Sequence, residues 1–188
     1  MRKMRPAQIA RSIGFMEQMA PPSFAFTVEE VVSMGRYAHQ QGLFGADPTG
    51  ERAVTHALEI TNLHQLRKQT IFSLSGGELQ RVMLAQVFCQ EPEILFLDEP
   101  ANHLDLKYQR DLFRLIDEWR KQSGHAVLSV VHDLSLSRMF ASHALILKEG
   151  KQLAFDTVNE ALTKENLNEA WDMDVPAWFK ALSMPWQT

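Results

Sequence analysis

Residues 74–78, Leu-Ser-Gly-Gly-Glu, and residues 93–100, Glu-Ile-Leu-Phe-Leu-Asp-Glu-Pro, decide how this chain of 188 residues folds. A mostly apolar segment, residues 79–89, separates the two motifs. The first motif is typical of a helix start, and the second is typical of a strand that ends in two carboxylates. Glycines at a helix start and carboxylates at a strand end together predict a site for a metal-bound phosphate chain.

The helix start depends on Ser75 and Glu78, which have the S-x-x-E spacing of a capping box. Their side chains can satisfy free backbone donors, so a helix is expected from Ser75 onward. Gly76 and Gly77 leave the first amides uncovered, and these amides with the helix dipole favour an anion such as phosphate. An ordinary capped helix explains the same residues, so both interpretations stay open here.

The strand over residues 94–97 is a continuous apolar run between Pro92 and Pro100, which is typical of a strand buried on both faces. Asp98 and Glu99 follow at its carboxyl end, where open α/β sheets bind their ligands. An aspartate there can hold Mg²⁺ while its neighbour orients the attacking water. Because adjacent carboxylates repel each other, the pair indicates a cation opposite them. A purely structural pair is the alternative.

Composition restricts the function classes. The length suits one domain, and 45% hydrophobic residues suffice for a core. A net charge of −4 gives no basic surface for duplex DNA, so nucleic acid is not an expected partner. Cys89 is the single cysteine, which favours a reducing compartment and a buried thiol. No apolar run could cross a bilayer, and Gln8, Arg11 and Ser12 interrupt any signal peptide, so a cytosolic product is expected.

Local patterns predict the elements before and after the two motifs. Residues 9–16 indicate a short strand, and a capping box begins a helix over 27–37. Asp47 is expected to cap another helix with Pro48 at its first position. A further helix follows Asp105 and is expected to stop at Gly124.

The last part of the chain alternates strands and helices, which predicts a mainly parallel sheet with crossovers. An apolar strand over 126–131 leads to His132, and Asp133 can cap a helix over 134–140. A hairpin is expected around Glu149-Gly150, and a helix begins near Thr163. The tryptophans that follow are expected to cover a core rather than to form a contact surface. They are Trp171, Trp178 and Trp186.

Four of these motifs, taken in chain order, resemble the ATPase subunits of ABC transporters. They are Leu74–Glu78, the strand ending in Asp98-Glu99, Asp105, and His132. Residues 27–39 and 100–109 resemble, more narrowly, the importers of iron chelates, haem and corrinoids. The resemblance covers about residues 7–165.

The resemblance implies an α/β fold: a P-loop NTPase-like, mainly parallel sheet with a helical (signature) subdomain, lacking the N-terminal P-loop strand. It implies four segments along the chain. They are residues 1–18, a remnant of the ATPase core up to the Q-loop; 19–89, the helical subdomain; 90–162, the α/β core with Walker B, D-loop and H-loop; and 163–188, a C-terminal helix and tail.

The resemblance also implies ATP and Mg²⁺ as cofactors and gives each site residue a role. Glu99 would polarise water, and His132 and Gln18 would sense the γ-phosphate, which makes these three the catalytic residues. Asp98 and Gln18 would be the metal ligands. The nucleotide of the opposite subunit would be contacted by Ser75, Gly76, Gly77, Glu78 and Asp105.

No P-loop of the form G-x-x-x-x-G-K-[ST] occurs in the sequence. The nearest approach, residues 45–50, is followed by Glu51-Arg52. In the resembled family the P-loop lies before the point where this chain begins, so an N-terminally truncated domain is expected. We expect exposed apolar strand edges, reduced stability and no ATP hydrolysis by the chain alone.

The implied partners are transmembrane permease subunits, a second ATPase subunit in a homo- or heterodimer, and indirectly a substrate-binding protein. The implied location is the inner face of the cell membrane, peripherally, through the permease. One alternative is a degenerate, non-catalytic subunit that lends its signature motif to a partner ATPase. Another is a soluble ABC ATPase of DNA repair or translation, which would carry a long coiled-coil insertion or two signature sets, and neither occurs here.

Overall fold

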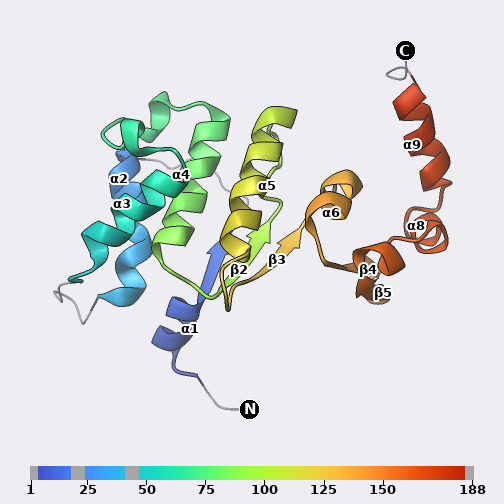
Figure 1. Cartoon of the computed structure of the whole chain (residues 1–188), viewed down its shortest axis with the longest axis horizontal. Helices are drawn as coiled ribbons and strands as arrows, with labels where there is room; N and C mark the ends of the chain where they lie inside the picture. Colours follow the sequence, from blue (N-terminus) through green and yellow to red (C-terminus); the bar gives the residue numbers. More distant parts are fainter. Residues whose placement is uncertain (1–3, 18–23, 41–46, 185–188) are drawn as a thin grey trace. The chain divides into compact units, whose positions relative to one another are not determined.

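A computed structural model describes residues 4–17, 24–40 and 47–184 of the chain (Figure 1). The chain divides into two compact units, Met1–His132 and Asp133–Thr188. The first unit contains both motifs that decide the fold.

The first unit is built on a parallel sheet of three strands in the order β1-β2-β3 (Figure 1). The strands are β1 (Ile13–Met16), β2 (Ile94–Asp98) and β3 (Ala126–Val130). In the register of the sheet, Phe15 lies beside Phe96, and Phe96 lies beside Leu128. The parallel sheet expected from the sequence is therefore confirmed.

One face of this sheet is well buried. Leu95 and Leu97 of β2 are almost fully buried. Helix α4 (Gly76–Cys89) approaches β1 so closely that a Cβ on Gly14 would lie 2.5 Å from Val87. Only glycine fits this position without a shift of the helix or the strand.

The other face of the sheet is open, which corrects the prediction of a strand buried on both faces. Phe15 is 55% exposed and Leu128 is 58% exposed, while Phe96 between them is half-buried. The alternation of buried and exposed residues along β2 and β3 places these side chains together on one face. The exposed apolar surface of these strands lies on a face of the sheet, and the exposure of strand edges stays a prediction.

The helical part of the first unit packs α2 and α3 against α4. Its elements are α2 (Val28–Ser33), the 3₁₀ helix η1 (Met34–His39), α3 (Gly50–Ile60), and the short 3₁₀ helices η2 (His64–Leu66) and η3 (Ile71–Ser73). Thr27 caps α2 through a capping box with Glu30, as the sequence predicts. The core here includes Val32, Leu58 and Leu84, none of which is accessible to solvent.

Arg36 is a buried charged residue whose hydrogen bonds connect separate segments of this helical part. Its Nε donates to Asp47 Oδ2 at 2.6 Å, and its Nη1 donates to Glu91 Oε2 at 2.6 Å and to the Cys89 carbonyl at 2.9 Å. The Arg36 guanidinium holds the pKa of Asp47 well below its usual value. The predicted buried thiol is confirmed at Cys89, and burial raises the pKa of this thiol to about 12.

Two predicted elements near these residues need correction. Within residues 9–16 only Ile13–Met16 is a strand, because the residues before it belong to helix α1 (Pro6–Ser12). This helix begins with proline at its first position, and the Arg5 amide just before it donates a hydrogen bond to the Gln8 side chain. Asp47 does not cap α3. Its carboxylate bonds Thr49 and Arg36 instead, so α3 begins only at Gly50.

Helix α5 (Leu106–Arg120) follows the second motif and packs on α4. Trp119 stacks on Phe88 with ring centroids 5.7 Å apart. Gly124 follows the helix with φ of +87°, a conformation that favours glycine. It lies beyond the helix end at Arg120, so the helix stops slightly earlier than predicted.

The second unit consists of one antiparallel hairpin and four helices among its described residues. They are α6 (Leu134–Phe140), β4 (His143–Lys148), β5 (Lys151–Thr157), α7 (Val158–Ala161), α8 (Lys164–Trp171) and α9 (Val175–Ser183). Asp133 caps α6 and the hairpin turns at Glu149-Gly150, both as predicted. Its core includes Ile146, Leu162 and Leu167.

The tryptophans of the second unit correct a prediction. Trp171 is 47% exposed and Trp178 is 54% exposed, so they do not cover a core within this unit. Trp186 lies outside the described residues. Across the part of the chain that the structure describes, we find no helix with the length and apolar character that a membrane span requires.

Candidate functional site

The carboxyl ends of β2 and β3 bring a carboxylate and an imidazole together. Glu99 directly follows β2, and His132 follows β3 after one intervening residue. His132 Nε2 lies 2.6 Å from Glu99 Oε1, and Asn102 Nδ2 donates to Glu99 Oε2 at 2.8 Å. Each oxygen of the Glu99 carboxylate thus has a partner. The sequence alone did not predict a role for Asn102, because its side chain meets Glu99 only through the turn that follows β2.

Glu99 is held more firmly than His132. The Glu99 side chain is 23% exposed, whereas the His132 side chain is 80% exposed. A histidine open to solvent can turn toward a ligand while the carboxylate keeps its position. This asymmetry suits a fixed carboxylate that orients water beside a mobile group that contacts phosphate.

The backbone at Glu99 is in the left-handed region, with φ of +46°. Two hydrogen bonds hold it there: the Glu99 amide donates to the Val130 carbonyl at 3.1 Å, and the Asn102 amide donates to the Glu99 carbonyl at 3.0 Å. A non-glycine residue in this conformation costs about 1–2 kcal/mol. Strain of this kind concentrates at functional positions, where the surrounding structure fixes a side chain in a required direction.

Asp98 is the last residue of β2 and is half-buried. Its carboxylate makes no hydrogen bond to any described residue, so its oxygens are available to a ligand. Within residues 4–17, 24–40 and 47–184, no cluster of three His, Cys, Asp or Glu side chains could hold a metal ion. Mg²⁺ usually takes one or two protein carboxylates and completes its shell with water and phosphate oxygens. Asp98 therefore fits a Mg²⁺ that is also bound by phosphate.

Ser75 is the N-cap residue of α4 and forms the predicted capping box with Glu78. The Ser75 amide and hydroxyl donate to Glu78 Oε2 at 2.8 and 2.7 Å, and the Glu78 amide donates back to Ser75 Oγ at 3.4 Å. The hydrogen bond from the Ser75 hydroxyl holds the pKa of Glu78 below its usual value. The capped helix is confirmed.

The two glycines after Ser75 have different surroundings. Gly76 is exposed, and a Cβ placed on it would meet nothing within 4 Å. Gly77 is buried, and a Cβ there would lie 2.5 Å from Cδ1 of Tyr108. Open space for a phosphate thus exists at Gly76. The absence of a side chain at Gly77 is explained by packing within the chain itself, because it makes room for the ring of Tyr108.

Asp105 lies at the start of α5 and is exposed. Its Oδ1 accepts a hydrogen bond from the Tyr108 amide at 3.1 Å, so Asp105 is the N-cap of this helix. Gln80 of α4 donates from Nε2 to the Pro100 carbonyl at 2.6 Å, which joins the signature helix to the turn after β2. The sequence assigned no role to Gln80 or Tyr108.

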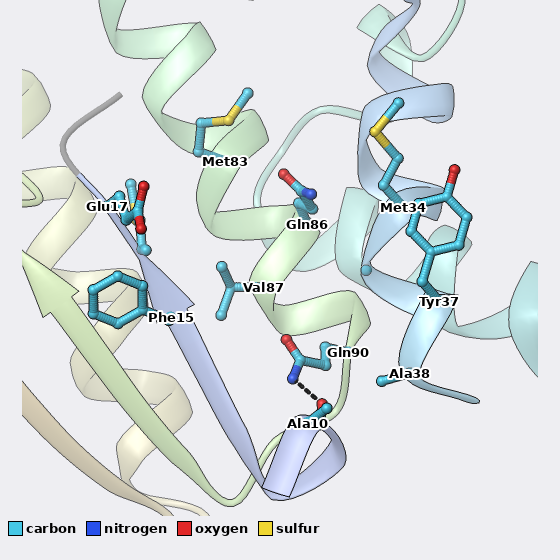
Figure 2. Close-up of a pocket in the computed structure, with 12 residues that line it drawn as sticks. Ala10, Phe15, Glu17, Met34, Tyr37, Ala38, Met83, Gln86, Val87 and Gln90 are labelled. Atoms are coloured by element: carbon cyan, nitrogen blue, oxygen red, sulfur yellow. Dashed lines mark hydrogen bonds between the residues drawn. The ribbon is translucent and has the colours of Figure 1, made fainter. Parts of the chain in front are cut away.

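Gln18, predicted as a metal and γ-phosphate contact, lies outside the described residues. Glu17 just before it belongs to a groove of about 860 Å³ between β1, η1 and α4. Figure 2 shows Phe15 and Glu17 on one side of this groove, Tyr37 on the other, and Gln86 of α4 between them. Its lining therefore mixes apolar and polar side chains.

Parallel strands with Asp98 and Glu99 at the tip of β2, joined to a helical part that ends in the glycine-opened helix α4, have the α/β arrangement of the P-loop NTPase class in its ABC form. The family model described as ABC transporter matches residues 2–102, more than half of the chain. The chain belongs to the ABC transporter family, as the resemblance implied.

Particular relatives are similar over most of the chain. The uncharacterized ABC transporter ATP-binding protein YvrA of Bacillus subtilis (strain 168) is 40% identical over 92% of this chain and 39% of its own length. The ferric enterobactin transport ATP-binding protein FepC of Escherichia coli (strain K12) is 37% identical over 88% of this chain and 61% of its own. The chain thus spans less than two thirds of each of these relatives.

A solved metal-chelate-type ABC transporter in an inward-facing conformation has the same fold. It superposes with a TM-score of 0.81 and 29% sequence identity, over 86% of this chain and 64% of the solved chain. The P-loop NTPase fold of the ABC ATPase type is therefore confirmed.

Proposed function

We propose that the chain belongs to an ATP-binding subunit that couples ATP hydrolysis to the import of an iron chelate or a related metal compound. The observation that carries this proposal is the hydrogen-bonded cluster of Glu99, His132 and Asn102 at the tips of adjacent parallel strands. The names of FepC and of the solved metal-chelate transporter support the class of cargo.

In this proposal, Glu99 orients and polarises the attacking water, and His132 moves from Glu99 toward the γ-phosphate. Asp98 is the protein ligand of Mg²⁺, which when bound neutralises charge on the phosphates. Gln18 completes the set as a contact to the metal or to the attacking water. The residues act mainly by position and charge, which supply most of the catalysis in phosphoryl transfer.

The start of α4 serves a second subunit in this proposal. Ser75, Gly76, Gly77 and Glu78 form the signature that faces the nucleotide of the opposite ATPase subunit, and Asp105 lies at the dimer contact. The open surface at Gly76 and the positive end of the α4 dipole support this assignment.

The groove beside Tyr37 is the proposed contact with a transmembrane permease. Its lining includes Glu17, which precedes Gln18 in the sequence, and the mixed polar and apolar lining suits an amphipathic segment of a partner protein. This contact would hold the subunit on the inner face of the membrane, and the substrate-binding protein would be reached through the permease. We expect Tyr37→Ala to weaken co-purification with the permease at least fivefold, whereas Phe72→Ala, at an exposed side chain outside the groove, does not.

The catalytic part of the proposal predicts that the purified chain alone hydrolyses no ATP. Its sequence contains no P-loop lysine and backbone cradle for the phosphates. The measurement is phosphate release with Glu99→Gln as the control. Turnover that is present in the chain and disappears in Glu99→Gln would contradict the prediction.

A second candidate, a non-catalytic subunit that lends its signature to a partner, is favoured by the capped and open start of α4 in a sequence without a P-loop. It predicts that the chain stimulates an intact ATPase of an iron-chelate importer and that Ser75→Arg abolishes the stimulation. Failure to form any complex with such an ATPase would discard this candidate. A soluble ABC ATPase of DNA repair or translation has no supporting observation in the described residues.

A further inference from the structure

The start of the signature helix and the start of α5 touch through one aromatic ring. The ring of Tyr108 lies against Gly77 so closely that a Cβ on the glycine would come within 2.5, 2.6 and 2.9 Å of Cδ1, Cγ and Cε1. No real Cβ contact is this short, so the ring fills the space that the missing side chain leaves. Tyr108 itself is half-buried, whereas its neighbour Leu106 is 83% exposed.

The same tyrosine is also held at its backbone. Its amide donates to Oδ1 of Asp105, the N-cap residue of α5, at 3.1 Å. An unbroken series of contacts therefore runs from the Asp105 carboxylate through the Tyr108 amide and ring to Gly77. Gly77 lies between Ser75 and Glu78, the two residues of the capping box.

A second link joins the same two segments close by. Gln80, one turn further along α4, donates to the Pro100 carbonyl at 2.6 Å and is half-buried. Two independent contacts of different kinds thus connect residues 77–80 with residues 100–108. A single contact allows rotation in every direction about itself, whereas two separated contacts leave only rotation about the line that joins them.

We propose that Tyr108, supported by Gln80, is a positioning residue that holds the signature start in fixed register with the Asp105 turn. The two segments then reach the opposite subunit as one rigid surface. The functional part of this inference rests on the proposed signature role of Ser75–Glu78, but the physical link does not depend on it.

The first test measures hydrogen exchange in the full chain. Tyr108→Ala is expected to raise exchange at least tenfold at the hydrogen-bonded amides of Glu78 and Leu79 and of Asn102 and Leu104 together, while amides of the core around Leu58 change less than twofold. Tyr108→Phe keeps the ring and Leu106→Ala truncates an exposed neighbour, so neither changes the exchange of these segments. Equal change at all amides, or change in only one of the two segments, would overturn the proposal.

The second test uses the clash at Gly77. Gly77→Ala must displace the ring, so it loosens both segments, whereas Gly76→Ala adds its Cβ in open space and leaves the exchange of both segments unchanged. Adding Gly77→Ala to Tyr108→Ala has little further effect, because the ring that it displaces is already gone. Additive effects of the two substitutions would contradict a contact between them.

The functional test adds the chain to an intact ATPase of an iron-chelate importer and measures ATP turnover. Tyr108→Ala is expected to lower the stimulation at least fivefold in kcat while the complex still forms, and Tyr108→Phe restores it. Unchanged stimulation by Tyr108→Ala would overturn the positioning role. If the unsubstituted chain does not stimulate at all, the proposed signature role of residues 75–78 toward a partner fails, and the exchange measurements still decide whether the link exists.

Discussion

Two clusters of polar side chains in the first unit are alike in composition and opposite in placement. Arg36 and Asp47 lie inside the helical part, with side chains 5% and 11% exposed, and Glu91 reaches Arg36 from the surface. His132 with Glu99 lies at the strand tips, and the His132 side chain is 80% exposed. Both clusters hold polar groups at short distances. This difference in exposure indicates that the buried cluster maintains the fold, while the exposed cluster is free to exchange its partners for a ligand.

Removing the buried charge should have the largest effect on stability. Arg36→Met leaves Asp47 and Glu91 without their cation, and breaking a buried ion pair on one side costs about 3–5 kcal/mol. Urea denaturation followed by circular dichroism measures the change in the free energy of unfolding. Arg110→Met is the matched control, since Arg110 pairs with Asp111 at the surface, where solvent screens the pair and its loss should hardly change stability. Similar losses in both variants would erase the distinction between the two clusters.

The exposed cluster should respond in the opposite direction. Glu99→Gly removes a carboxylate and relieves a φ of +46°, so we expect stability to rise by up to about 1 kcal/mol. Any ATP turnover that the chain supports with a partner should be lost in the same variant. His103→Gly, at an exposed residue with φ of +62°, should raise stability similarly and leave turnover unchanged. A clear loss of stability in Glu99→Gly would mean that this cluster also maintains the fold.

The sequence predicted those features that depend on neighbouring residues. The capping boxes at Thr27 and Ser75, the cap at Asp133 and the hairpin at Glu149-Gly150 each need only a few adjacent side chains, and all are present. The strand ending in Asp98 was found for the same reason, because its apolar run is continuous.

Features that depend on distant segments could not be predicted from local patterns. Arg36 meets Glu91 across the helical part, and Tyr108 meets Gly77 across two helices. No periodicity in the sequence relates these pairs. The one-sided burial of the sheet was missed because an apolar run such as β2 looks the same whether one or both of its faces are covered. The partnership of Glu99 with His132 was suggested by family resemblance alone, since their strands are adjacent only in the fold.

The smallest expected effect concerns a third cluster, at the surface, which lies between the two extremes. Glu29 accepts hydrogen bonds from Arg67 and Lys68, and these hold its pKa at about 2, below its ordinary value of 4.5. A depressed pKa contributes stability that is present above pH 4.5 and is lost as the pH falls toward 2. Because solvent screens this pair, we expect a loss of only about 1 kcal/mol over that range. Unfolding midpoints measured from pH 7 to pH 2 should therefore fall less steeply in Glu29→Gln than in the unsubstituted chain. An equal dependence of the unfolding midpoint on pH in both proteins would show that solvent screening already cancels the Glu29 ion pair. Asp47 would then be the better candidate for the acid-sensitive group, because Arg36 lowers the pKa of Asp47 further.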